Sequence, residues 1–65
     1  MTYQEANQKG RVLLEEKHME DASVDAWLLL EFVTGMNRTR FFVENYKEMP
    51  EAEEKQYFAL IKRRR

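Results

Sequence analysis

The most apolar segment of the chain lies between Asp21 and Gly35, and its hydrophobic positions recur at helical spacing. One face of the predicted helix carries five apolar residues, Ala22, Ala26, Leu29, Leu30 and Val33. A second apolar stripe follows the i, i+4, i+8 positions Val24, Leu28 and Phe32. Only a narrow sector is polar, and it contains Ser23, Glu31 and Thr34. Because a helix that is apolar on most sides is buried on most sides, we expect the central helix of a small bundle.

Both ends of this segment carry residues that start or stop helices. Asp21 can cap the first turn with its carboxylate, which also suits the positive end of the helix dipole. Gly35 can adopt the left-handed conformation that closes many helices. The sequence therefore predicts a helix between these two residues.

A first helix is predicted from Thr2 to about Lys17. Thr2 and Glu5 have the spacing of a capping box, and the inward positions of the helix are Tyr3, Ala6, Gly10, Leu13 and Leu14. Glycine in a helix interior costs about 1 kcal/mol relative to alanine. We therefore expect a second helix to approach closely at Gly10.

A short third helix and a longer fourth helix complete the pattern. Asn37 is a good N-cap for the third helix, whose predicted apolar side consists of Phe41, Phe42, Val43 and Tyr46. A polar turn, residues 44–49, leads to Pro50, whose missing N–H costs nothing near the first turn of the last helix. The apolar face of that helix is predicted to contain Tyr57, Leu60 and Ile61.

Helices with short connections and no strand-like alternation predict an all-α fold, a small antiparallel helical bundle of four to five helices. The chain has 65 residues, enough for one domain covering residues 1–65. A domain of this size buries only about 60% of its unfolded surface, so we expect marginal stability.

Several kinds of chemistry are missing from the sequence. The absence of cysteine excludes disulfides and thiolate metal sites, and His18, the only histidine, is expected to be solvated in a loop. No glycine-rich phosphate loop, metal-ligand spacing or base near the single serine is present. No apolar run is long enough to span a membrane. We therefore expect that the chain alone is not an enzyme, holds no cofactor or metal, and has no membrane partner.

The formal net charge is −1, but the charges are unevenly placed. All 12 acidic residues precede Lys55, whereas the chain ends in Lys62-Arg63-Arg64-Arg65. Acidic residues in the first turn of the last helix and basic residues in its last turn suit the helix dipole. Nucleic-acid binders usually carry a basic face over the whole domain, so we expect no nucleic-acid partner.

The order of several short motifs resembles a known family. Asp25-Ala26 opens a helix that continues through Leu28-Leu29-Leu30 to Gly35, Arg38-Thr39 follows, and Ala59-Leu60-Ile61-Lys62-Arg63-Arg64 lies near the end of the chain. This pattern resembles the N-terminal domain of the HemK/PrmC-type protein-glutamine methyltransferases. In that family an Asp-Ala pair opens a Leu-Leu-Leu helix ending in Gly, and the last helix ends in Leu-(Val/Ile)-x-Arg-Arg. The resemblance covers nearly the whole chain.

The resemblance implies a non-catalytic domain of an enzyme that uses S-adenosylmethionine to methylate a glutamine side chain in peptide chain release factors. In the family, a larger Rossmann-like domain binds the cofactor and grips the glutamine with an Asn-Pro-Pro-Tyr motif. This chain contains neither feature, so no catalytic or cofactor residue is carried over. We expect a piece of a longer cytoplasmic methyltransferase, whose partners are the release factor and the parent's own catalytic domain.

Three residues are candidates for partner binding: Trp27, Arg38 and Arg40. Trp27 falls in the narrow polar sector of the central helix. It either packs on the first helix or under a loop, or it is partly exposed and contacts a partner, because tryptophan is enriched at interface hot spots. Arg38 and Arg40 lie in the first turn of the third helix, where positive charge is unfavourable to the dipole. They are either solvated or in contact with an acidic partner or another domain.

Two other functions stay open on the sequence alone. A standalone helical protein-interaction or dimerisation module would show the same four helices. A nucleic-acid-binding protein would use Arg38, Arg40 and the arginines at 63–65, and its binding would weaken steeply with salt.

Overall fold

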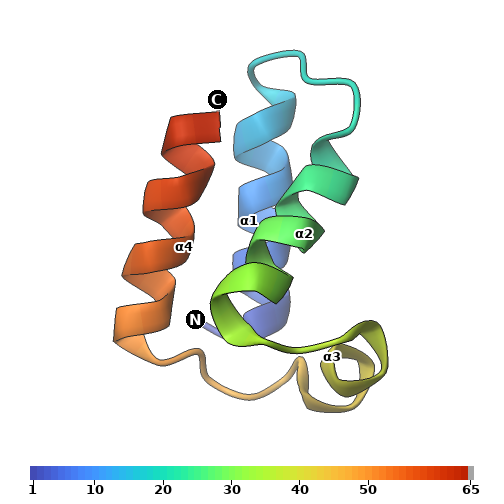
Figure 1. Cartoon of the computed structure of the whole chain (residues 1–65), viewed down its shortest axis with the longest axis vertical. Helices are drawn as coiled ribbons and strands as arrows, with labels where there is room; N and C mark the ends of the chain where they lie inside the picture. The colour runs from blue at the N-terminus through green and yellow to red at the C-terminus, as the bar shows by residue number, and fades with distance from the viewer. Residues whose placement is uncertain (65) are drawn as a thin grey trace.

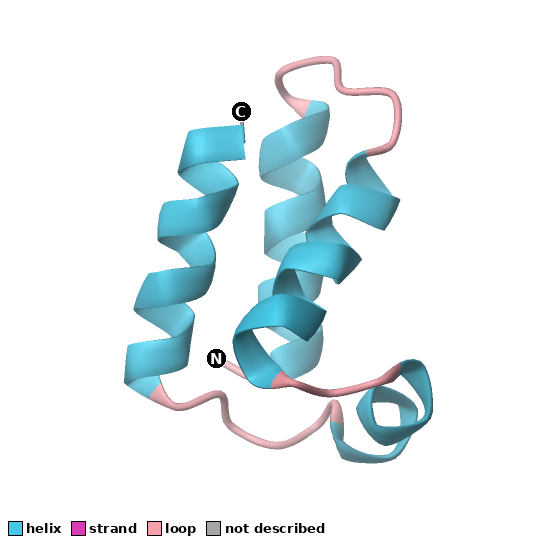
Figure 2. Ribbon diagram, in the orientation of Figure 1, coloured by secondary structure: helices cyan, strands magenta, loops and turns pink. Residues whose placement is uncertain are grey.

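The computed structural model describes residues 1–64, which form four α-helices joined by short connections (Figure 1, Figure 2). The helices are α1 (Tyr3–Glu15), α2 (Ala22–Thr34), α3 (Arg38–Glu44) and α4 (Glu51–Arg64). Across these 64 residues, β-type pairing is limited to one isolated bridge between Thr2 and Glu48. The predicted all-α bundle is confirmed, with four helices.

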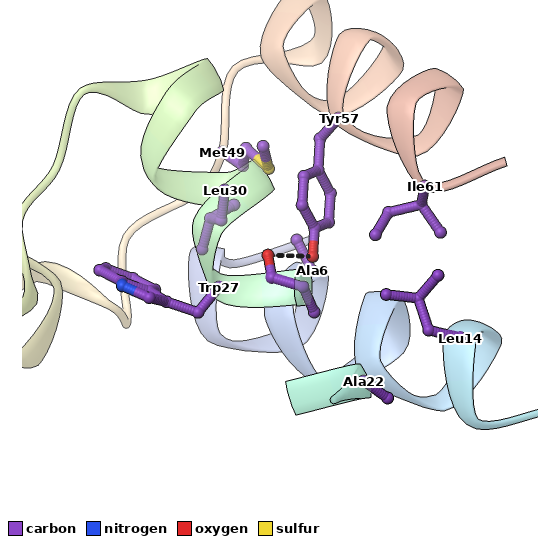
Figure 3. Packing of buried hydrophobic residues seen from close by; sticks show 9 residues of the cluster. Ala6, Leu14, Ala22, Trp27, Leu30, Met49, Tyr57 and Ile61 are labelled. Carbon is purple, nitrogen blue, oxygen red and sulfur yellow. Dashed lines mark hydrogen bonds between the residues drawn. The ribbon is translucent and has the colours of Figure 1, made fainter. Parts of the chain in front are cut away.

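Three of the helices build the core. In Figure 1, α1 and α4 run in the same direction, whereas α2 runs obliquely in the opposite direction and α3 lies across the foot of the bundle. As predicted, α2 is antiparallel to both α1 and α4, whereas α1 and α4 are parallel to each other. The buried core cluster draws on all three long helices (Figure 3) and consists of Ala6, Leu14, Ala22, Ala26, Trp27, Leu30, Met49, Tyr57 and Ile61.

Tyr57 of α4 reaches across the core to both other long helices. Its side chain is fully buried, and its hydroxyl donates a hydrogen bond of 3.1 Å to the carbonyl oxygen of Ala26 (Figure 3). A Cβ atom at Gly10 would collide with that hydroxyl and would lie 2.9 Å from the Cζ atom. A second helix was predicted to approach closely at Gly10, and the structure shows that the contact is made by the Tyr57 side chain of α4. Burial also raises the pKa of Tyr57 well above its ordinary value, so the hydroxyl remains a donor at neutral pH.

The connection between α3 and α4 closes the first turn of α1. The backbone N–H of Tyr3 donates to the Lys47 carbonyl at 3.1 Å, and that of Gln4 donates to the Asn45 carbonyl at 3.0 Å. The first N–H groups of a helix have no partner within the helix, so these bonds fix the connection at the foot of α1. The predicted polar turn is thus attached to the bundle and ends in Met49, which is buried.

The predicted helix caps are confirmed at three of four positions. Thr2 and Glu5 form both hydrogen bonds of the capping box. Gly35 closes α2 in the left-handed conformation, at φ 74°, and the Asn37 side chain accepts a backbone N–H of α3 at 2.7 Å. Asp21 precedes α2 as predicted, but its side chain makes no capping hydrogen bond. Its φ of −106° and ψ of 40° lie outside the extended region from which N-cap side chains reach the helix.

The helix α1 ends two residues earlier than predicted, at Glu15 instead of Lys17. His18 is exposed as expected and adopts the left-handed conformation with φ 59°. Its N–H donates to the Glu15 carbonyl at 2.9 Å, and the N–H of Met19 lies 3.5 Å from the Leu14 carbonyl. This pair of contacts is the Schellman arrangement that commonly ends helices.

The Gly10→Ala variant tests the packing of the Tyr57 ring against Gly10. Alanine has the higher helix propensity, by about 1 kcal/mol, but the collision with Tyr57 should lower the free energy of unfolding by about 1–3 kcal/mol. Urea unfolding followed by circular dichroism measures the difference. As a control, Gln8→Ala on the exposed face of α1 should change the free energy by less than about 0.5 kcal/mol. A Gly10→Ala protein as stable as the parent would contradict the close approach.

Candidate functional site

Trp27 lies at the contact between α2 and α3, with only 5% of its surface exposed. Phe41 of α3 packs edge-on against the indole, with the ring centroids 5.1 Å apart at an interplanar angle of 65°. The hypothesis of a partly exposed tryptophan is therefore wrong. The helical pattern of α2 could not reveal that α3 returns to cover this sector of the helix. Trp27 positions α3, and its ring is not a free contact surface.

The two candidate arginines have different surroundings, although both are exposed. The Arg38 guanidinium lies over the Trp27 ring, 4.9 Å from its centroid, which is cation–π distance. Arg40 Nε donates to Glu44 Oε2 at 2.8 Å, and Lys47 Nζ donates to Glu44 Oε1 at 2.9 Å. The hydrogen bonds from Lys47 and Arg40 lower the pKa of Glu44. The structure thus brings Arg38 and Trp27 together, whereas Arg40 belongs to an ion-pair network on α3.

An apolar face of α2 is open to solvent. Val24, Leu28 and Phe32, here termed the α2 stripe, are 47%, 51% and 73% exposed. We expected this stripe to be buried like the rest of the helix, and that expectation is wrong. The long helices α1 and α4 cover the side of α2 that carries Ala26, and α3 covers Trp27. None of the elements in residues 1–64 covers the third side.

A second exposed apolar group lies on and just after α3. Phe42, Val43 and Tyr46, here termed the α3 patch, are 81%, 63% and 68% exposed. The sequence suggested that these residues and Phe41 form the buried side of the helix, but only Phe41 packs against the core. A helix of 7 residues presents one narrow stripe to its neighbour, so its other apolar residues face the solvent.

A hollow of about 520 Å³ beside the start of α4 is lined by Glu48, Met49, Glu51, Glu54, Lys55 and Phe58. Two of its carboxylates are paired: Glu48 with the N-terminal ammonium group at 3.1 Å and Glu51 with Lys55 at 3.3 Å. Within residues 1–64, no three histidine or carboxylate side chains are grouped so that they could hold a metal ion. No helix in the same range is both long and apolar enough to cross a bilayer.

The basic end of α4 takes part in the packing of the helices. Arg64 Nε and Nη2 donate to Asp25 Oδ2 at 3.3 and 3.0 Å. One of the arginines assigned to the nucleic-acid alternative therefore ties α4 to the first turns of α2. Arg65, which belonged to the same group, lies outside the described residues.

A comparison with protein families supplies the deciding observation. The profile of the PrmC N-terminal domain matches residues 5–65. The chain belongs to the PrmC N-terminal domain family. No curated protein and no solved structure matches the chain. The resemblance noted in the sequence is thus confirmed, and the chain is the N-terminal domain of a PrmC-type protein.

The motifs behind the resemblance have structural roles in this PrmC N-terminal domain. Gly35 ends α2, and Asp25 pairs with Arg64 although the two are 39 positions apart. Among the consecutive leucines, Leu30 is fully buried, whereas Leu28 is half exposed. Helical spacing identified the buried leucine, but the long-range ion pair and the open α2 stripe gave no signal in the sequence.

A matched pair of alanine variants tests the attachment of α3 through Trp27. Phe41→Ala should lower the free energy of unfolding by about 1.5 kcal/mol, because a partly buried ring is lost. Phe42→Ala, at the neighbouring 81% exposed position, should change it by less than about 0.5 kcal/mol. Thermal unfolding measures both, and the fluorescence of Trp27, the only tryptophan, should shift to the red in Phe41→Ala alone. Equal effects of the two variants would contradict the packing described for α3.

Proposed function

We propose that this PrmC N-terminal domain is the non-catalytic docking module of a methyltransferase that modifies a glutamine of peptide chain release factors. The observation that carries the proposal is the family match over residues 5–65. In this proposal S-adenosylmethionine and the reacting glutamine are bound by the catalytic domain of the parent enzyme. The domain described here contributes binding energy for the protein substrate in the cytoplasm.

The surface of the domain supports a docking role. The three long helices and α3 bury one side of each other and leave the α2 stripe and the α3 patch exposed. Exposed apolar side chains that are grouped on a protein surface commonly mark a site of protein interaction. Arg38 lies over the Trp27 ring and one turn before Phe42 of the α3 patch, and it has no ion-pair partner within residues 1–64, so it is the candidate arginine best placed to take part. With a net charge of −1, the domain is a poor match for nucleic acid.

A docking module is expected to affect KM more than kcat. Contacts made equally in the ground state and in the transition state lower KM without changing kcat. Because the module and the catalytic domain belong to one protein, binding at the first site raises the effective concentration of the substrate at the second. The module should therefore matter for a whole release factor and not for a short peptide.

Deletion of residues 1–65 from the parent enzyme tests this proposal. We expect KM for the intact release factor to rise about tenfold or more, with kcat nearly unchanged, because uniform binding is lost. Turnover of a short peptide that carries the target glutamine should be unaffected, which also controls for folding of the catalytic domain. An equal loss of kcat/KM for the release factor and for the short peptide, or no loss for either, would refute the docking role. Sedimentation of the 65-residue chain as a tight dimer would favour the dimerisation module instead.

A further inference from the structure

We infer that the α2 stripe is a binding surface for a short amphipathic helix of a partner protein. That helix would carry lysine or arginine beside its apolar side chains. This inference rests on the proposed function, in which the partner is the release factor, and it specifies the face and the chemistry of docking. The α2 stripe is the longest line of exposed apolar side chains on a core helix of the domain, with Val24, Leu28 and Phe32 one turn apart.

The geometry of the α2 stripe suits a helical segment. Phe32 lies eight positions after Val24, so the stripe extends about 12 Å along the helix axis at about 1.5 Å per residue. Helices pack on one another through ridges of side chains spaced four or three residues apart, and Val24, Leu28 and Phe32 form such a ridge at i, i+4 and i+8. Phe32, which is 73% exposed at one end, offers the largest apolar contact.

The charges along α2 select the partner. Four acidic residues and no basic residue lie between Glu20 and Thr34. By helical periodicity, Glu31 and Asp25 flank the stripe on opposite sides, and Asp21 lies at its N-terminal end. Arg64 neutralises Asp25, but Asp21 and Glu31 form no ion pair with any residue from 1 to 64. A partner with basic residues beside its apolar stripe would pair with these two carboxylates.

A second copy of the chain fits the α2 stripe less well than a basic helix of a partner protein does. Parallel packing of two α2 helices would place the unpaired Glu31 carboxylates of the two copies opposite each other, which is unfavourable. Antiparallel packing about Leu28 would place Glu31 opposite Asp25, which Arg64 already pairs, so Glu31 would gain no basic partner from α2. A stable dimer buries about 800 Å² on each partner, a large share of the 4534 Å² surface of this chain. Three partly exposed side chains do not supply that area.

Two designed peptides test the chemistry of the face directly. Each is a helical peptide of about 15 residues with the same leucine stripe, flanked by lysines in one and by glutamates in the other. Titrated into the isotope-labelled 65-residue chain, the lysine peptide should shift the amide resonances of α2 and bind about tenfold or more tightly than the glutamate peptide. Glu31→Lys should reduce or reverse that preference.

Matched variants of the chain locate the binding. Leu28→Ser and Phe32→Ser should each weaken binding of the lysine peptide about tenfold, whereas Val12→Ser, which removes a 43% exposed valine from α1, should leave it unchanged. Equal affinity for the two peptides, resonance shifts confined to the α3 patch, or no saturable binding would overturn the inference. So would a dimer of the chain that Leu28→Ser dissociates.

The same substitutions in the parent enzyme separate this inference from the proposed function. Leu28→Ser combined with Phe32→Ser should raise KM for the release factor as much as deletion of residues 1–65 does. If the deletion raises KM but the double substitution does not, the domain docks the release factor through another face, and only the inference fails. If the deletion has no effect, the proposed function fails, and the peptide titrations still decide whether the face takes a basic helix.

Discussion

The three-helix core depends on the space that Gly10 leaves for the ring of Tyr57. The ring enters between α1 and α2, and its hydroxyl reaches the carbonyl oxygen of Ala26 because no Cβ atom of α1 lies in its path. One side chain of α4 thereby contacts both other long helices at the centre of the domain (Figure 3). Glycine weakens α1 locally, and the packing of a large buried aromatic ring compensates for that cost.

This arrangement also determines which side of α2 stays open. With Ala26 turned toward Tyr57 and Trp27 covered by α3, the remaining side of the helix carries the α2 stripe to the solvent. Within residues 1–64, the other three helices lie against the two covered sides of α2, and no further helix lies on the third side. The exposed stripe thus follows from the position of the core, and it is the surface that we propose as a binding site for another protein.

Local signals in the sequence predicted most of the fold, because capping residues and helical spacing act over a few positions. The capping box at Thr2, the left-handed Gly35 and the inward positions of α1 were all found in this way. The errors arose where distant segments meet. Partial exposure of Trp27 was wrong because Phe41, which covers the ring, belongs to another helix. The α2 stripe was expected in the core because the hydrophobic pattern of a helix does not show how many neighbours pack against it. Partner binding by Arg38 and Arg40 stays a prediction.

Native-state amide hydrogen exchange of the free chain tests the central claim, that Tyr57 joins α1, α2 and α4 into one cooperative unit to which α3 is attached separately. Amides near Gly10, Ala26 and Tyr57 should exchange only through global unfolding and should share one opening free energy. Amides of α3, which has no buried residue, should exchange through a local opening of lower free energy. Exchange of α4 at a lower free energy than α1 and α2, or equal protection of α3, would contradict the account.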